Sequence, residues 1–290
     1  VIRRSKGFVV PTPRSLTGST IVVTGASDGI GRIAARTLAT RGAEVLVVGR
    51  SPEKTAAAAA EIGGRAFVAD FASFDDVRRV ADELRNSVDH IDVLLNNAGG
   101  TFDPSRRTAD GHEPNVQINH LSPFLLTHLL LDRLGGPAGS RIVNTSSVGN
   151  LGGRIDLQDI AYDHSSPAEF RAYCTSKLMN IGFTRGATAR WSDRSITSVA
   201  VHPGAVRSNF GNANILFRVI YRTPLKYVTS ISAESGAEPL VSVAVDKADT
   251  EVAGIYYSRH KARGRTNGQV DDPAVVDGLW TESEKLVGLA

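Results

Sequence analysis

Short apolar runs rich in β-branched residues alternate along the chain with longer stretches of helical periodicity. Because these runs are apolar throughout and do not alternate with polar residues, we expect strands that are buried on both faces, as in a parallel sheet covered by helices. The pattern predicts an α/β fold, a doubly wound Rossmann-type parallel sheet of seven strands in a single domain. The predicted strands are 20–24, 45–48, 66–69, 93–95, 142–144, 198–201 and 255–257.

Two of the intervening stretches carry signals for the start of a helix. Ser51 and Pro52 precede a run of alanines over 56–60, and Ser73 precedes two aspartates. A hydroxyl that accepts from the first backbone amides, a proline in the first turn and carboxylates beside it all favour a helix N-terminus. The two longest helices are predicted over 115–134 and 168–191.

A glycine-rich turn, residues 24–31, joins the first predicted strand to the helical pattern that begins near Arg32. Glycines let the backbone turn sharply and approach a pyrophosphate, while the amides and the dipole of the helix N-terminus stabilise the anion. Because this turn follows the first strand of an alternating chain, it predicts a dinucleotide site, and a plain turn is the weaker alternative. The residues expected to contact the cofactor here are Gly25, Ser27, Asp28, Gly29, Ile30 and Gly31.

The end of the second predicted strand indicates which dinucleotide binds. A carboxylate there would bond the free 2′-hydroxyl of the adenosine ribose, whereas this chain has Arg50 and Ser51. A guanidinium and a hydroxyl suit a 2′-phosphate, so we expect NADP(H). NAD(H) stays an alternative, because Arg50 could be merely solvated and Asp28 adds a negative charge nearby.

A tyrosine, a lysine and a serine carry the candidate chemistry. Tyr173 and Lys177 are four residues apart on a predicted helix, so they share one face. Ser146 and Ser147 follow the strand over 142–144, whose end should open on the same sheet edge as the glycine-rich turn. The ammonium of Lys177 and an oxidised nicotinamide would favour the phenolate of Tyr173 and make it a usable acid/base. Ser147 could hold the substrate oxygen by a hydrogen bond.

Together these motifs resemble the short-chain dehydrogenase/reductase family over about residues 20–208. Residues 96–99 match the family's Asn-Asn-Ala-Gly segment, and 203–204 match its Pro-Gly motif. The resemblance implies a catalytic tetrad of Asn119, Ser147, Tyr173 and Lys177, in which Lys177 also binds the nicotinamide ribose and Asn119 holds a proton-relay water. It places Asp70 at the adenine, Asn97 near the adenosine ribose and 206–208 at the nicotinamide amide. The other implied cofactor contacts are Phe71, Ala98, Gly99, Tyr173, Lys177, Pro203, Gly204, Val206 and Ser208.

Within that family, residues 119–121, 141–144, 172–178 and 202–204 look like the retinol dehydrogenase branch, as does the long interval between Ser147 and Tyr173. Such relatives often carry a membrane-anchoring apolar segment, and none is visible here, so no integral membrane segment is expected. The departure argues against a retinoid, and the expected substrate is another lipophilic molecule, for example a steroid-like or polyketide-like ketone or alcohol. A lid over such an apolar substrate is predicted around 209–231, where apolar and basic residues mix, and an ordinary amphipathic helix packed on the core is an equal alternative.

The composition indicates which partners and which cellular compartment to expect. The net charge of +3 reflects scattered arginines, so no nucleic-acid partner is expected. Cys174 is the only cysteine, which fits a reducing cytoplasmic setting, and the histidines have no metal-ligand spacing, so no metal is expected. Residues 1–18 are predicted to form an N-terminal arm before a single domain over 19–290.

The apolar faces predicted over 115–134 and 178–189 could pair across a two-fold axis in a homodimer or homotetramer, or merely cover the sheet. The expected function is an NADP(H)-dependent oxidoreductase that interconverts a ketone or aldehyde and an alcohol on a lipophilic small molecule. Two alternatives stay open. The chain could catalyse a non-redox net reaction such as epimerisation or dehydration, or bind the nucleotide as a sensor or scaffold without turnover.

Overall fold

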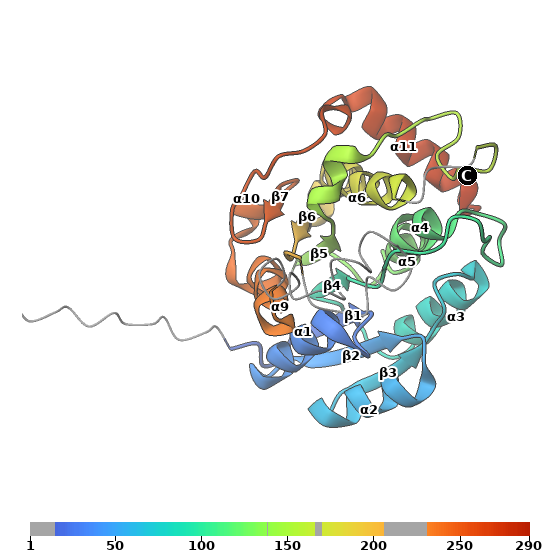
Figure 1. Cartoon of the computed structure of the whole chain (residues 1–290). Coiled ribbons are helices and arrows are strands. Elements are labelled where there is room, and N and C mark those ends of the chain that lie inside the picture. The colour runs from blue at the N-terminus through green and yellow to red at the C-terminus, as the bar shows by residue number, and fades with distance from the viewer. Residues whose placement is uncertain (1–14, 138, 166–169, 206–230) are drawn as a thin grey trace, which may run out of the picture.

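The computed structural model describes residues 15–137, 139–165, 170–205 and 231–290. Within these ranges seven parallel strands form one sheet between two layers of helices, in the order β3-β2-β1-β4-β5-β6-β7 (Figure 1). The Rossmann-type fold predicted from the sequence is confirmed. The strands are β1 (Thr20–Thr24), β2 (Glu44–Gly49), β3 (Arg65–Val68), β4 (Val93–Asn96), β5 (Ser140–Thr145), β6 (Ile196–His202) and β7 (Tyr256–Ser258).

Each central strand contributes side chains to two separate hydrophobic clusters. In β2, Leu46 and Val48 belong to one cluster and Val45 and Val47 to the other, and all four are almost completely buried. Successive side chains of a strand point to opposite faces, so a strand covered on both sides must be apolar at every position. This requirement explains why unbroken apolar runs located the strands.

Helices α3, α5, α6 and α11 cover one face of the sheet, and α1, α2 and α9 cover the other (Figure 1). The predicted starts of two helices are confirmed, because the hydroxyls of Ser51 and Ser73 accept from the amides of Lys54 and Asp76 and cap α2 and α3. The helices are α1 (Gly29–Thr40), α2 (Pro52–Ile62), α3 (Phe74–Arg85), α4 (Pro114–Val116), α5 (Ser122–Leu129), α6 (Arg171–Trp191), α9 (Ala233–Val241), α10 (Asp249–Val252) and α11 (Pro273–Leu286).

The long helix expected over 115–134 differs from its prediction. Its first part is the short α4, which passes into the π-helical turn Gln117–Leu121 and then into α5, and α5 ends at Leu129. The cause of the turn is local. Pro123 has no backbone N–H, so the carbonyl of Asn119 four residues earlier cannot receive its α-helical hydrogen bond.

Helix α11 packs against the outer faces of α5 and α6. The Trp280 ring lies 5.1 Å from Phe124, 5.8 Å from Phe183 and 5.1 Å from Trp191, measured between ring centroids. All four side chains are buried. The apolar faces that could have paired across a two-fold axis are therefore covered by a helix of the same chain.

The described part of the chain begins next to the core. Leu16, which falls within the expected N-terminal arm, is buried in the cluster under α1, and its N–H donates to the carbonyl of Arg41. Over the described ranges, no helix has both the length and the apolar composition needed to cross a membrane.

Candidate active site

The site lies where the carboxyl ends of the central parallel strands meet. The turn after β1, residues 97–100 after β4, Ser146 and Ser147 after β5, and Pro203 after β6 all leave the sheet at this edge. Strand β1 stands where the chain changes direction across the sheet, with β2 on one side and β4 on the other. Ligands of doubly wound folds bind in the crevice at such a point.

The glycine-rich turn is shaped by close backbone approaches. Gly25 has a φ of 66°, and a Cβ there would stand 2.8 Å from the Cα of Ala98. A Cβ on Gly31 would stand 2.3 Å from the carbonyl oxygen of Gly25. The turn can therefore fold tightly in front of α1 only with glycine at both positions, and Asp28 at its tip caps the helix by accepting from the amide of Gly29.

Thr24 and Asn97 fasten this turn to the segment after β4. The Thr24 hydroxyl accepts from the amides of Asn97 and Ala98, at 3.0 and 2.9 Å, and the Asn97 Nδ2 donates to the Thr24 carbonyl at 3.0 Å. The Asn97 Oδ1 is buried, and no hydrogen-bond donor of the described residues reaches it. An unsatisfied acceptor beside an anion-binding turn fits a hydroxyl-bearing dinucleotide.

A second basic residue, Lys54, lies near the end of β2 together with the predicted Arg50. Arg50 is exposed, and the Ser51 hydroxyl caps α2 and donates to Glu53. The Lys54 ammonium lies 3.6 Å from Asp28 Oδ2 and offsets the negative charge that argued for NAD(H). Lys54 reaches Asp28 across 26 residues of sequence, so no local pattern could have identified this contact.

The predicted adenine contacts lie after β3. Asp70 accepts from the amide of Ala72, and its own amide donates to Asp76. That bond lowers the pKa of Asp76. The side chain of Phe71 is buried in the core, so only its backbone can face a ligand, and its carbonyl accepts from Ser122.

Tyr173 and Lys177 lie one turn apart on α6, as predicted. The Lys177 Nζ is 5.7 Å from the centre of the Tyr173 ring and donates to the carbonyl of Thr145 at 3.2 Å. Burial lowers the pKa of Lys177 to about 7, because a charged ammonium is poorly solvated there. The Tyr173 ring also stacks on the ring of Phe170, with the ring centroids 5.2 Å apart and an interplanar angle of 26°.

The two serines after β5 have different partners. The Ser146 hydroxyl is buried and donates to the carbonyl of Lys177 at 2.7 Å. The Ser147 hydroxyl accepts from the amide of Gly149 at 3.0 Å, and a Cβ on Gly149 would stand 3.3 Å from both Ser147 Oγ and Tyr173 Cε1. Ser147 therefore faces the tyrosine, whereas Ser146 fixes the strand to α6.

Asn119 contributes its side chain to the walls of the site. Its Oδ1 accepts from the amide of Gly100 at 2.8 Å, and its Nδ2 donates to the Gly100 carbonyl at 2.9 Å and to Ser176 at 3.1 Å. Every hydrogen of this amide is used. The group that Asn119 can offer to a water is thus its backbone carbonyl, which Pro123 leaves without an α-helical donor.

Sequence reasoning missed Asn150, a fully buried residue in the 3₁₀ turn Val148–Gly152. Its Nδ2 donates to the carbonyl of Ser147 at 2.8 Å, and its Oδ1 accepts from the amide of Asn267 at 3.0 Å. The turn that carries Ser147 is thereby fastened to the C-terminal part of the chain. No local pattern reveals a contact across so many residues.

A shallow hollow opens beside Tyr173, lined by Gly149, Gly152, Phe170, Arg171 and Cys174. Burial raises the pKa of the Cys174 thiol to about 11, so the thiol is protonated at neutral pH. Val148 and Leu151, which precede the lining glycines Gly149 and Gly152 in the sequence, are exposed, with 52% and 42% of their surfaces accessible. The hollow thus has an apolar border next to the tyrosine.

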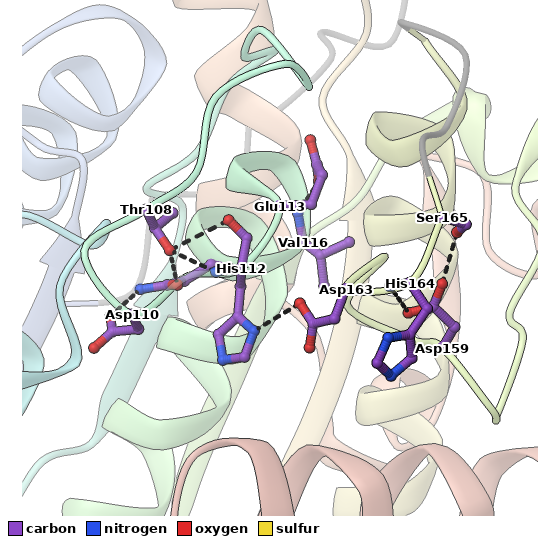
Figure 2. Close-up of polar contacts among 10 residues, drawn as sticks. Thr108, Asp110, His112, Glu113, Val116, Asp159, Asp163, His164 and Ser165 are labelled. Atoms are coloured by element: carbon purple, nitrogen blue, oxygen red, sulfur yellow. Dashed lines mark hydrogen bonds and ion pairs between the residues drawn. The ribbon is translucent and has the colours of Figure 1, made fainter.

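The loop before α4 meets the loop before α6 beside the site, where the amide of Glu113 donates to the carbonyl of Ala161 at 3.4 Å. His112, on the loop before α4, lies 3.1 Å from Asp163, on the loop before α6, measured from Nδ1 to Oδ1 (Figure 2). Thr108 donates to Gln117 and accepts from the amide of His112 within the first loop. The contacts of His112 with Asp163 and of Glu113 with Ala161 join the two loops, whereas the Thr108 bonds lie on the side of the first loop alone.

The last predicted contacts lie after β6. Gly204 has a φ of 108°, and a Cβ there would approach the Ile231 side chain to 2.6 Å. Val206, Ser208 and most of the predicted lid lie outside the described residues. Among the residues that are described, no three His, Cys, Asp or Glu side chains gather as metal ligands would.

Several known proteins are similar to this chain in sequence, and solved structures are similar to it in fold. A family model described as short chain dehydrogenase matches residues 19–215. A protein from Streptomyces sp. (strain C5), named as a candidate daunorubicin C-13 ketoreductase, DnrU, is 38% identical over 97% of this chain and 99% of its own. Human retinol dehydrogenase 13 is 34% identical over 98% of this chain and 88% of its own. The solved structure of an uncharacterized protein from Mycobacterium paratuberculosis is similar with a TM-score of 0.77 at 31% identity, over 95% of this chain and 96% of its own.

Proposed function

The chain belongs to the short-chain dehydrogenase/reductase family, in its retinol dehydrogenase-like branch, and we propose that it interconverts a lipophilic ketone or aldehyde and an alcohol with NADP(H). Membership makes it an oxidoreductase of carbonyl compounds and alcohols. In the proposed reaction Tyr173 is the acid/base, and Asn119, Ser147 and Lys177 complete the site. One observation supports these roles. Ser147 Oγ and the Tyr173 ring both lie next to Gly149, and Lys177 lies one helical turn from Tyr173.

Proton transfer at the substrate oxygen is assigned to Tyr173. In reduction its phenol gives a proton to the carbonyl oxygen while the carbonyl carbon takes up hydride, and in oxidation both transfers reverse. The bound dinucleotide supplies or accepts that hydride at its nicotinamide ring. Ser147 accepts from Gly149, so its own proton is available to donate to the substrate oxygen as negative charge develops there.

Lys177 stabilises the deprotonated form of Tyr173. Its charge is costly in the ligand-free site, where burial brings the pKa to about 7. A phenolate forming beside it would favour the ammonium and raise that pKa again. The same ammonium and the backbone carbonyl of Asn119 would hold the nicotinamide ribose and a relay water, as the family resemblance implies.

The preference for NADP(H) is inferred from the basic residues after β2. Arg50 is exposed at the strand end, and Lys54 on the first turn of α2 neutralises Asp28. A doubly negative 2′-phosphate would gain charge-assisted bonds from both side chains. The adenine end would rest near Asp70 and Asn97, and the pyrophosphate on the amides of residues 25–31.

A lipophilic substrate suits the border of the site. Val148 and Leu151 are exposed beside the hollow next to Tyr173, and Phe170 continues the apolar wall. Exposed apolar side chains grouped at a pocket favour an apolar ligand. The named relatives, a candidate anthracycline ketoreductase and retinol dehydrogenases, support a carbonyl or alcohol on a large apolar skeleton.

A cytoplasmic location and assembly into a homodimer or homotetramer stay predictions. Because α11 covers the faces of α5 and α6, a dimer would have to use another surface. Light scattering across a range of concentrations measures the assembly directly.

The first experiment compares wild type with Tyr173→Phe. Both are titrated with NADPH and NADH, and a panel of lipophilic ketones is then added while absorbance at 340 nm is followed. We expect both proteins to bind NADPH more tightly than NADH and only wild type to oxidise it. Equal binding of both cofactors, with no turnover by either protein, would overturn the proposal. Product formed without a change at 340 nm would instead identify a non-redox reaction.

A further inference from the structure

A buried pair of side chains, Glu113 and Asn115, lies next to the segment after β4 that enters the candidate site. Both are fully buried on the segment that begins α4. The Asn115 Oδ1 accepts from the amide of Phe102 at 2.8 Å, and its Nδ2 donates to the carbonyl of Phe102 at 2.9 Å. One amide therefore satisfies both backbone groups of a single residue on the segment after β4.

Asn119 repeats this contact one helical turn later. It bonds the amide and the carbonyl of Gly100 in the same way, at 2.8 and 2.9 Å. Two amides spaced four residues apart thus hold alternate residues of the facing segment, much as a neighbouring strand would. Among the described residues, no backbone group bonds the amides and carbonyls of Gly100 and Phe102 in this way, so these two side chains are what hold the segment.

Glu113 determines which way the Asn115 amide points. Its Oε1 accepts from Asn115 Nδ2 at 2.6 Å, and its Oε2 accepts from the amide of Val116 at 2.9 Å. A carboxylate only accepts hydrogen bonds, so the nitrogen end of the asparagine must face it and the oxygen end must face the amide of Phe102. Glu113 belongs to the same loop as His112, which Figure 2 shows reaching to Asp163.

The segment held in this way forms one wall of the candidate site. A Cβ on Gly99 would stand 2.4 Å from Asn119 Oδ1 and 3.4 Å from Lys177 Nζ. Any outward movement of Phe102 would carry Gly99 and Gly100 away from these groups. We propose that Asn115, oriented by Glu113, is a positioning residue that holds residues 99–102 against Lys177 and Asn119 for cofactor binding and turnover. This inference rests on the proposed oxidoreductase function.

The test compares Asn115→Ala and Glu113→Gln with the matched control Gln117→Ala. Gln117 is an equally buried amide on the same helical segment, but it bonds Asp110 and Thr108 and makes no hydrogen bond to residues 99–102. All three variants lose buried hydrogen bonds and should lose stability by comparable amounts. Glu113→Gln keeps the shape of the side chain but places an N–H against either Asn115 Nδ2 or the amide of Val116.

Three readouts separate positioning from general stability. Below the melting temperature, Asn115→Ala and Glu113→Gln should lower kcat by about 10- to 100-fold, as small misplacements in active sites do, whereas Gln117→Ala should stay within about twofold of wild type. Both variants should bind NADPH more weakly than the control does. Amide hydrogen exchange at Gly100 and Phe102 should lose protection in Asn115→Ala and keep it in Gln117→Ala.

Equal kcat values for Asn115→Ala and Gln117→Ala, or retained protection at Phe102 in Asn115→Ala, would overturn the positioning role. If Glu113→Gln kept the kcat and the NADPH affinity of wild type, Glu113 would have no part in this positioning role. If wild type itself reduces no ketone, the proposed function fails instead. Exchange protection and NADPH affinity of the variants then still decide whether Asn115 positions the segment.

Discussion

The ammonium nitrogen of Lys177 lies 3.2 Å from the carbonyl oxygen of Thr145, and in the described residues no carboxylate forms an ion pair with it. A neutral carbonyl solvates a buried charge only partly, which is why the pKa falls from 10.5 to about 7. The charged form of Lys177 is therefore destabilised in the ligand-free site, and a negatively charged ligand or a phenolate would stabilise it.

Lys177→Met should stabilise the ligand-free protein at neutral pH while abolishing turnover. The unfolded chain holds the proton up to the ordinary pKa of 10.5, whereas the folded chain releases it near 7, so the cost of folding is largest at and below pH 7 and vanishes above 10.5. We expect a gain in unfolding free energy on the order of a few kcal/mol at pH 7 that shrinks as pH rises toward 10.5.

Urea unfolding at several pH values measures this gain, with the exposed Lys54→Met as the control. If the gain were the same at pH 7 and pH 10, a pH-independent packing effect would explain it and the buried charge would not.

Arg50→Ser and Lys54→Gln should each weaken NADPH binding by about tenfold and leave NADH binding almost unchanged, since each removes a charge-assisted bond that only the 2′-phosphate receives. Arg65→Gln is the matched control, because Arg65 is also at the surface and pairs with Glu44 at the far end of the sheet. Fluorescence titration gives the affinities. Parallel losses for NADPH and NADH would exclude a role at the 2′-phosphate.

Ser147→Ala and Ser146→Ala should fail in different ways. The first removes a donor that faces Tyr173, and kcat should fall by about 100-fold with little change in stability. The second removes the hydrogen bond from the Ser146 hydroxyl to the buried carbonyl of Lys177, at a cost of about 0.5–1.5 kcal/mol in stability, and should retain most of its turnover. Steady-state kinetics and urea titration of both variants test the assignment, which a reversed pattern would contradict.

Trp280→Ala should lower the unfolding free energy by about 3–5 kcal/mol, because it opens a cavity among Phe124, Phe183 and Trp191. It should also expose the apolar face of α5 and α6. Light scattering of the variant is expected to show association at concentrations where wild type does not change. If the variant had the same unfolding free energy as wild type, α11 would contribute little to the stability of the core.

The strands and the main site motifs could be predicted because each depends on neighbours in the sequence. A strand buried on both faces must be apolar at every position, as β2 is, and Tyr173 and Lys177 share a helix face whatever surrounds them. Ser51 and Ser73 likewise act on amides three residues away.

The missed features depend on contacts between distant residues or on a local break in regular structure. Lys54 reaches Asp28, Asn115 reaches Phe102, and Asn150 reaches Asn267, and no periodicity encodes any of these pairs. The π-helical turn at Asn119 had a visible signal in Pro123, but apolar periodicity over that stretch predicted an unbroken helix. Loops that combine such contacts are specified by tertiary structure.

Strand β7 and helix α11 follow all the other described strands and α-helices in the sequence and are synthesised after them, yet they complete the sheet and cover α5 and α6. Ser283 of α11 even contacts His120, the neighbour of Asn119. A nascent chain leaves the ribosome from its N-terminus, so the glycine-rich turn and six strands emerge while the faces of α5 and α6 are still bare. A premature stop codon before α11 would consequently yield a fragment that aggregates through the exposed apolar faces of α5 and α6. It would not yield a smaller active enzyme.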